Sequence, residues 1–366
     1  EDTATDPTDT ESQPVAEDTD PATTPTVRTY DFSEFNPNNR EFGVRLSAVH
    51  VGPQYPDRMA EEDLLPMGAA LATDLGFQTI EIFLDPRICR ATNDTTVPGG
   101  LYQTHKWCDE NNPNRMGVSD LKTLAQFPEY QAVLDDPDIK RYIITFDPIN
   151  PQAANQSQIH RLEERWSAEQ LQLLYGEVKQ FTKYLLNRYE GTNKEFILSA
   201  PSEMDWHLTS VGEERGGCER GDRACAEVDA NPRAVQNTIL YLNRIQDAIT
   251  DAKAELNNPE DVEIAQACEI NFVVRVSEER KTGLTEVIPN TNCDYVAWSA
   301  HEAWRAIVDQ IRINREIEAT GNPVTDPDYM RRPEDIILRA LERISQYPPL
   351  GMEPGHRNII IGEIGY

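Results

Sequence analysis

The sequence predicts an α/β fold, a (β/α)8 TIM barrel that lacks its last β/α unit. From Tyr30 onward, seven short runs rich in β-branched residues alternate with long amphipathic stretches, as in β/α units around a parallel sheet. Acidic and histidine side chains follow these runs, where a barrel carries its active site. A doubly wound sheet is the alternative, but it normally has a glycine-rich turn after its first strand, whereas "HVGPQYPD" stands here. The barrel is therefore favoured.

The pattern places each element in order along the chain. The seven predicted strands are 42–51, 78–86, 140–148, 195–203, 262–272, 294–302 and 358–366. Amphipathic stretches between them predict helices at 60–75, 118–135, 167–189, 232–256, 303–317 and 333–346. The last helix opens with Pro333, Glu334 and Asp335, which suit a first helical turn.

The N-terminal segment differs in composition from the rest. Residues 1–28 are rich in Thr, Pro, Asp and Glu and have almost no large apolar side chain, so we expect a disordered acidic linker before a barrel at 29–366. Such a tract without an initiator Met indicates a spacer left after export. We expect a secreted protein or a cell-surface or periplasmic lipoprotein anchored through this linker. No apolar run approaches the ~20 residues of a membrane-spanning helix.

The six cysteines fit the same compartment. A Cys218–Cys225 bridge would close the loop "CERGDRAC", and a Cys89–Cys108 bridge would brace the insert between them. A cytosolic chain with six free thiols is the alternative. Zinc is disfavoured because no CxxC pair occurs.

The net charge excludes one class of partner. A formal charge of −29 argues against nucleic acid, because phosphate binding rests on clustered Lys and Arg.

Polar side chains gather at the predicted strand ends. They are His50, Asp85, Asp147, Glu203 with Asp205, Glu269 with Asn271, His301 with Glu302, and Glu363. Asp85 and Asp147 precede prolines, so turn formation explains them. Alternation along the fourth strand puts Glu203 on the face of Ser199. Two carboxylates that meet from strands four and seven suit glycoside cleavage with retention, which needs them ~5–5.5 Å apart.

The segments "PSEMDW", "DYVAWSAHE" and "IGEIGY" resemble the corresponding strand ends of clan A glycoside hydrolases, which are retaining (β/α)8-barrel glycosidases. The resemblance covers roughly residues 40–366 and leaves the subfamily unassigned. It implies Glu203 as the general acid/base and Glu363 as the nucleophile. His301 falls where that clan often places an aromatic or hydrogen-bonding residue beside the nucleophile.

The sequence departs from the clan in two places. Many members have Asn immediately before the acid/base, where its amide holds the sugar 2-OH, and this chain has Ser202. The clan's eighth strand and helix should follow Glu363, yet the sequence ends at Tyr366. We expect a truncated product, with closure of the barrel by 30–40 as the alternative.

Side chains near the strand ends are candidates for substrate binding. Trp206 and Trp298, with Trp107 and Trp304, offer faces on which sugar rings stack. Asp205, Glu269 and Asn271 are candidates for binding hydroxyls. The substrate-binding set is Ser202, Asp205, Trp206, Glu269, Asn271, Trp298 and His301.

Three functions follow. The first is a retaining glycoside hydrolase acting on a β-linked oligo- or polysaccharide, with no metal or organic cofactor. The second is a non-catalytic carbohydrate-binding or scaffold protein on the same barrel. The third is a metal-dependent hydrolase with His50, Asp85, Glu269 and His301 as ligands, which the absence of HxH on the first strand disfavours.

Overall fold

A computed structural model describes ten parts of the chain. They are residues 47–48, 64–84, 120–146, 148, 166–201, 203–209, 228–274, 280–301, 333–353 and 358–362. The chain divides into two compact units, Glu1–Arg45 and Leu46–Tyr366, and every described residue belongs to the second. The boundary predicted at residue 28 lies outside the described residues.

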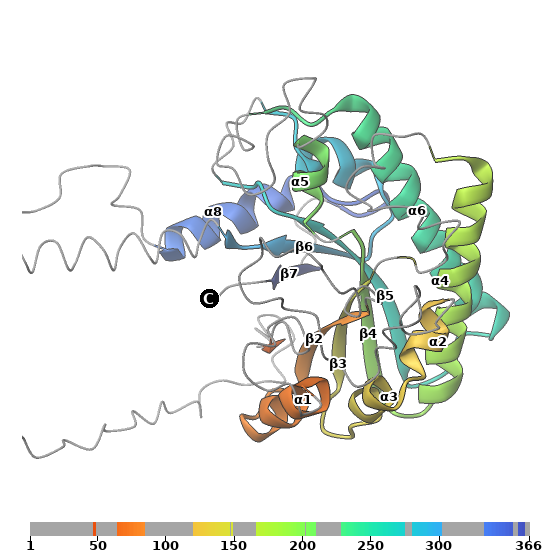
Figure 1. The fold of residues 1–366 in the computed structure, drawn as a ribbon. Coiled ribbons are helices and arrows are strands. Elements are labelled where there is room, and N and C mark those ends of the chain that lie inside the picture. The colour runs from red at the N-terminus through yellow and green to blue at the C-terminus, as the bar shows by residue number, and fades with distance from the viewer. Residues whose placement is uncertain are drawn as a thin grey trace, which may run out of the picture. The chain divides into compact units, whose positions relative to one another are not determined.

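A seven-stranded parallel sheet forms the centre of the second unit (Figure 1). Its strands are β1 (Ser47–Ala48), β2 (Thr79–Leu84), β3 (Arg141–Phe146), β4 (Lys194–Ser199), β5 (Val262–Ile270), β6 (Tyr295–Ser299) and β7 (Ile359–Gly362). Each strand pairs with the next one in sequence. The sheet is curled, as in part of a (β/α)8 barrel (Figure 1). The predicted α/β class and the place of all seven strands are therefore confirmed.

The helices occupy the connections between strands. They are α1 (Leu64–Asp74), α2 (Leu121–Ala125), α3 (Pro128–Leu134), α4 (Ala168–Tyr189), α5 (Met204–Thr209), α6 (Pro232–Glu255), η5 (Gly283–Val287), η6 (Ile288–Asn290) and α8 (Pro333–Ser345). Ser167 and Gln170 form a capping box at the start of α4, and Asn231 caps α6. The helix predicted at 303–317 lies outside the described residues.

Two predictions of elements were wrong. One helix was expected over 118–135, but α2 and α3 are separate, because Pro128 pushes Phe127 into an extended conformation (φ −60°, ψ 141°). A strand was expected to run to Glu203, but β4 ends at Ser199 and α5 begins at Met204.

Both faces of the sheet are buried. On one face, residues such as Ile82, Ile144 and Trp298 pack with the helices in the main core. On the other face, Ile197 and Ala297 belong to a smaller apolar cluster. This double burial is typical of parallel sheets and leaves little alternation between polar and apolar residues.

The face with the smaller cluster also carries polar groups that are buried or partly buried. Near the amino ends of the strands, Arg141 pairs with Glu195, whose other oxygen accepts the Tyr295 hydroxyl at 3.0 Å. Farther along, the Thr145 hydroxyl donates to Glu81 at 3.1 Å. These contacts satisfy charges that would otherwise be costly to bury.

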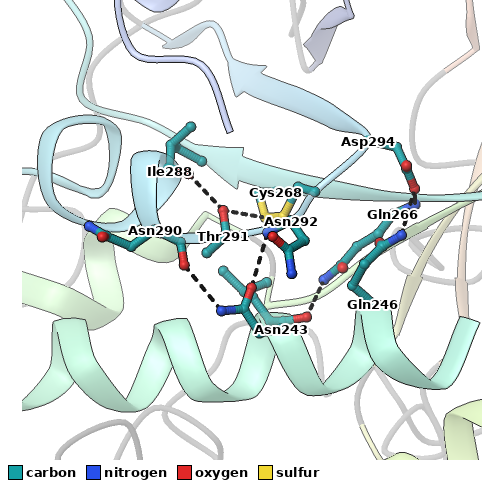
Figure 2. Close-up of a disulfide and its surroundings, with 11 residues drawn as sticks. Asn243, Gln246, Gln266, Cys268, Ile288, Asn290, Thr291, Asn292 and Asp294 are labelled. Atoms are coloured by element: carbon teal, nitrogen blue, oxygen red, sulfur yellow. Dashed lines mark hydrogen bonds between the residues drawn. A yellow bond between two sulfur atoms is a disulfide. The ribbon is translucent and has the colours of Figure 1, made fainter. Parts of the chain in front are cut away.

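A disulfide joins Cys268 of β5 to Cys293, just before β6 (Figure 2). Both cysteines are buried on the helix-facing side of the sheet. Asn243 of α6 holds the neighbouring segment, donating to the Asn290 carbonyl at 3.1 Å and accepting the Asn292 N–H at 3.0 Å. The sequence did not single out this pair.

The two bridges proposed from the sequence, Cys218–Cys225 and Cys89–Cys108, lie outside the described residues. Among the described residues, no helix is long and apolar enough to span a membrane.

Candidate functional site

Glu203 lies in the short turn between β4 and α5. The chain leaves β4 at Ser199, passes the Ala200–Pro201 peptide, and reaches Glu203 with φ of +51°. A non-glycine residue in this left-handed region costs roughly 1–2 kcal/mol, and such residues gather at functional sites. The direction of the Glu203 side chain is therefore set by this turn, not by strand alternation from Ser199.

Three side chains meet on one carboxylate oxygen of Glu203. Oε1 accepts the Asn271 Nδ2 amide at 2.7 Å and the Trp206 indole Nε1 at 3.2 Å, and it lies 2.7 Å from His301 Nε2. Asn271 directly follows β5, Trp206 belongs to α5, and His301 comes two residues after β6. Three elements thus converge on Glu203 at the carboxyl edge of the sheet.

The Glu203 cluster is partly open to solvent. The Glu203 side chain is 16% exposed and that of His301 is 39% exposed. His301 contacts Glu203. Its expected place beside Glu363 stays a prediction, because Glu363 lies outside the described residues.

Asp205 is fully buried beneath this cluster. Its Oδ2 accepts the backbone N–H groups of Asn271 at 2.8 Å and Phe272 at 3.0 Å, and its Oδ1 accepts that of Gly283 at 2.6 Å. Burial raises the pKa of Asp205, the three hydrogen bonds oppose this shift, and the charge of Glu203 adds to it. Asp205 therefore holds the backbone at Asn271, Phe272 and Gly283. The expected contact of Asp205 with substrate hydroxyls is wrong, because the side chain is fully buried.

The two described tryptophans of the predicted binding set differ in position. Trp206 is partly buried and packs edge-on against Phe272, with ring centroids 4.8 Å apart. Trp298 is fully buried in the core on the helix-facing side of β6. The prediction that Trp298 stacks on a sugar is therefore wrong, because no part of its ring reaches solvent.

Glu269 lies within the sheet, two residues before Asn271. It is only 7% exposed, and it accepts hydrogen bonds from the hydroxyls of Ser199 at 3.3 Å and of Ser299. These partners come from the two strands that flank β5. The buried position makes Glu269 part of the sheet interior rather than an open binding surface.

The other predicted site residues lie outside the described residues. They are Ser202, Glu363, His50, Asp85, Asp147, Glu302, Trp107 and Trp304. The register nevertheless places the end of β7, because Gly362 pairs with Ser299. Glu363 directly follows Gly362 in the sequence.

Sequence reasoning missed the mutual arrangement of these residues. Asn271 was expected to bind substrate, whereas its amide donates to Glu203. Its Oδ1 is buried without a hydrogen-bond partner among the described residues. No group of three or more His, Cys, Asp or Glu is arranged to hold a metal ion in the described part of the chain.

No protein-family model matches the chain, and no curated protein matches its sequence. Among solved structures, the chain is similar to GH5_18 from Streptomyces cattleya in complex with Manb1-4GlcNAc, with 10% identity and a TM-score of 0.37 over 74% of this chain. It spans 57% of the length of that protein. It is also similar to a D-allulose 3-epimerase from Methylomonas sp., with 13% identity, a TM-score of 0.33 and 86% of each chain covered. At these TM-scores, neither similarity identifies a reaction or a substrate.

Proposed function

We propose that this chain is a retaining glycoside hydrolase of clan A that cleaves a β-linked oligo- or polysaccharide. One observation carries the proposal: Glu203, with a left-handed backbone, is held at the carboxyl edge of a parallel α/β sheet by side chains from three elements, two of which donate hydrogen bonds to it. Barrel enzymes place their catalytic groups at this edge. The finer assignment, a (β/α)8 barrel with Glu203 as general acid/base and Glu363 as nucleophile, belongs to the same proposal.

The two carboxylates would divide the reaction between them. The Glu363 carboxylate attacks the anomeric carbon as the bond to the leaving oxygen breaks, and Glu203 gives its proton to that oxygen. Glu203, now ionised, then takes a proton from water, whose oxygen attacks the same carbon and releases Glu363. The net reaction adds one water across the glycosidic bond and retains the anomeric configuration.

We place this activity outside the cytoplasm. The buried Cys268–Cys293 disulfide supports this location, because such bonds persist in oxidising compartments. The acidic Thr/Pro-rich N-terminal segment fits a linker to a secreted or lipid-anchored protein.

The test is a panel of β-linked glycans and aryl β-glycosides, with Glu203→Ala and Glu363→Ala as variants. Azide should rescue Glu203→Ala on an aryl glycoside and give the β-glycosyl azide, because azide replaces water in the second step. It should rescue Glu363→Ala to the α-glycosyl azide, because azide then replaces the nucleophile. Glu263→Gln is the matched control, since Glu263 is exposed and paired with Lys253 at the opposite end of β5.

Each result separates the candidate functions. Hydrolysis that survives in Glu203→Ala without azide, on substrates with poor leaving groups, would contradict the assigned acid. Binding of glycans without any hydrolysis would favour the carbohydrate-binding alternative.

A further inference from the structure

The buried Asp205 carboxylate links two structural features of the site. It fixes the backbone at Asn271 and Phe272, the first two residues after β5, through their N–H groups. Each of these residues in turn supports one donor to Glu203. Asn271 donates its own amide, and Phe272 packs edge-on against the ring of Trp206, whose indole N–H is the second donor.

Both donors have a fixed chemical role. An indole N–H only donates hydrogen bonds, and the NH₂ group of an amide side chain likewise only donates them. Both act on Oε1, and His301 Nε2 contacts the same oxygen. Hydrogen bonds to an ionised carboxylate favour the ionised form. Two lone pairs are the whole acceptor capacity of an oxygen, so an acid proton would be accommodated on Oε2.

We propose that Asn271 and Trp206 are positioning residues for Glu203, anchored by Asp205, and that they hold Oε1 as a permanent acceptor so that Oε2 exchanges the catalytic proton. This inference rests on the proposed function, in which Glu203 is the acid/base. In this arrangement Asn271 and Asp205 position the general acid Glu203 and do not bind the substrate. His301 beyond β6 and Asp205 in α5 are titratable groups that face Glu203 and act on its charge.

The test is a pH titration of the Glu203 carboxyl group. The titration is monitored by the carboxyl carbon NMR signal in protein labelled with ¹³C-glutamate. The Glu203 signal is assigned from its loss in Glu203→Gln. Asn271→Leu removes the amide donor at nearly constant shape, and Trp206→Phe removes the indole N–H while keeping a ring against Phe272. Each variant should move the midpoint upward by about half to one unit, because loss of a donor disfavours the ionised form. The double variant should move it further.

Asn358→Leu is the matched control. The Asn358 amide donates to the Asp294 carbonyl at 2.9 Å beside the amino end of β7, opposite the edge that carries Glu203. This variant should leave the Glu203 midpoint at its wild-type value. Near-ultraviolet circular dichroism shows that each variant is folded before its titration is compared.

The outcomes separate this inference from the proposed function. Folded Asn271→Leu and Trp206→Phe proteins that both titrate at the wild-type midpoint would overturn the inference. Upward shifts in a protein that hydrolyses no glycan would support the arrangement of donors and overturn only the proposed function. Where hydrolysis is measured, the alkaline limb of kcat/KM should move upward with the midpoint, because the acid keeps its proton to higher pH. A loss of kcat without movement of that limb would assign a purely structural role and overturn the inference.

Discussion

Gly283 lies where the backbone approaches the buried Asp205 carboxylate. A Cβ at this position would lie 3.0 Å from Asp205 Oδ1 and 3.0 Å from both Cγ and Sδ of Met204. Met204 and Asp205 are both fully buried, so neither has free space to move. Gly283→Ala should therefore lower the free energy of unfolding by about 1–3 kcal/mol in urea.

The matched control for this glycine is Gly176, in the middle of α4. A Cβ there has nothing within 4 Å, so Gly176→Ala should raise the free energy of unfolding by about 0.5–1 kcal/mol through helix propensity. An unchanged urea midpoint in Gly283→Ala would show that the start of η5 relaxes without cost.

Lys194 is the second residue whose surroundings make a prediction. It is 4% exposed, and its ammonium donates to the carbonyls of Leu134 and Asp136, both at 2.7 Å, and to the Tyr142 hydroxyl at 2.9 Å. Burial lowers the pKa of Lys194 to about 8 from 10.5. Between pH 8 and 10.5 the unfolded chain binds more protons at Lys194 than the folded chain does. The free energy of unfolding should therefore increase as the pH rises through this range.

The measurement is urea unfolding of wild type and Lys194→Met from pH 8 to pH 10. The contribution of Lys194 should be absent from the variant, so the wild type should gain stability relative to it across this range. The raised pKa of Tyr142 has the opposite effect above about pH 10, because the unfolded chain then loses the phenolic proton first, so the comparison stops there. Lys122→Met, at an exposed site, is the control. Parallel curves for wild type and Lys194→Met would refute the shift.

At the scale of elements, the Cys268–Cys293 bridge ties β5 to the start of β6 across 25 residues. In the chain-entropy view, closing a loop of this length in the unfolded state stabilises the fold by about 3 kcal/mol. Replacing both cysteines with Ala should lower the free energy of unfolding by that order, measured in urea under oxidising conditions. When the wild type is unfolded without a reductant and treated with an alkylating reagent, Cys268 and Cys293 should both stay unmodified. Alkylation of either cysteine would show that the bridge is absent.

The helices illustrate where local signals suffice. Apolar periodicity predicted α4 and α6 to within one residue at each end. The structure adds the caps Ser167 and Asn231, which act on their own neighbours in sequence. The split between α2 and α3 was missed, although Pro128 carries the signal for it.

At the scale of the whole molecule, the spatial order of the strands follows their order in sequence. Consecutive parallel strands put all their carboxyl ends at one edge, so residues distant in the chain meet there. Glu203, Asn271 and His301 come together in this way.

The sequence by itself determined the α/β class, the seven strands, the boundaries of α4, α6 and α8 to within one residue, and the location of Glu203 near the carboxyl end of the fourth strand. These properties follow from periodicity, capping and turn residues, which act over a few positions. Only the tertiary structure decided which side chains face the core and which face Glu203. Trp298 was assigned to substrate and is buried, because both faces of a parallel sheet are apolar and alternation does not identify the helix side. Asp205 and Asn271 were given to the substrate and instead contact the protein, because their partners lie more than 60 positions away in the chain and are brought close only by the pairing of strands.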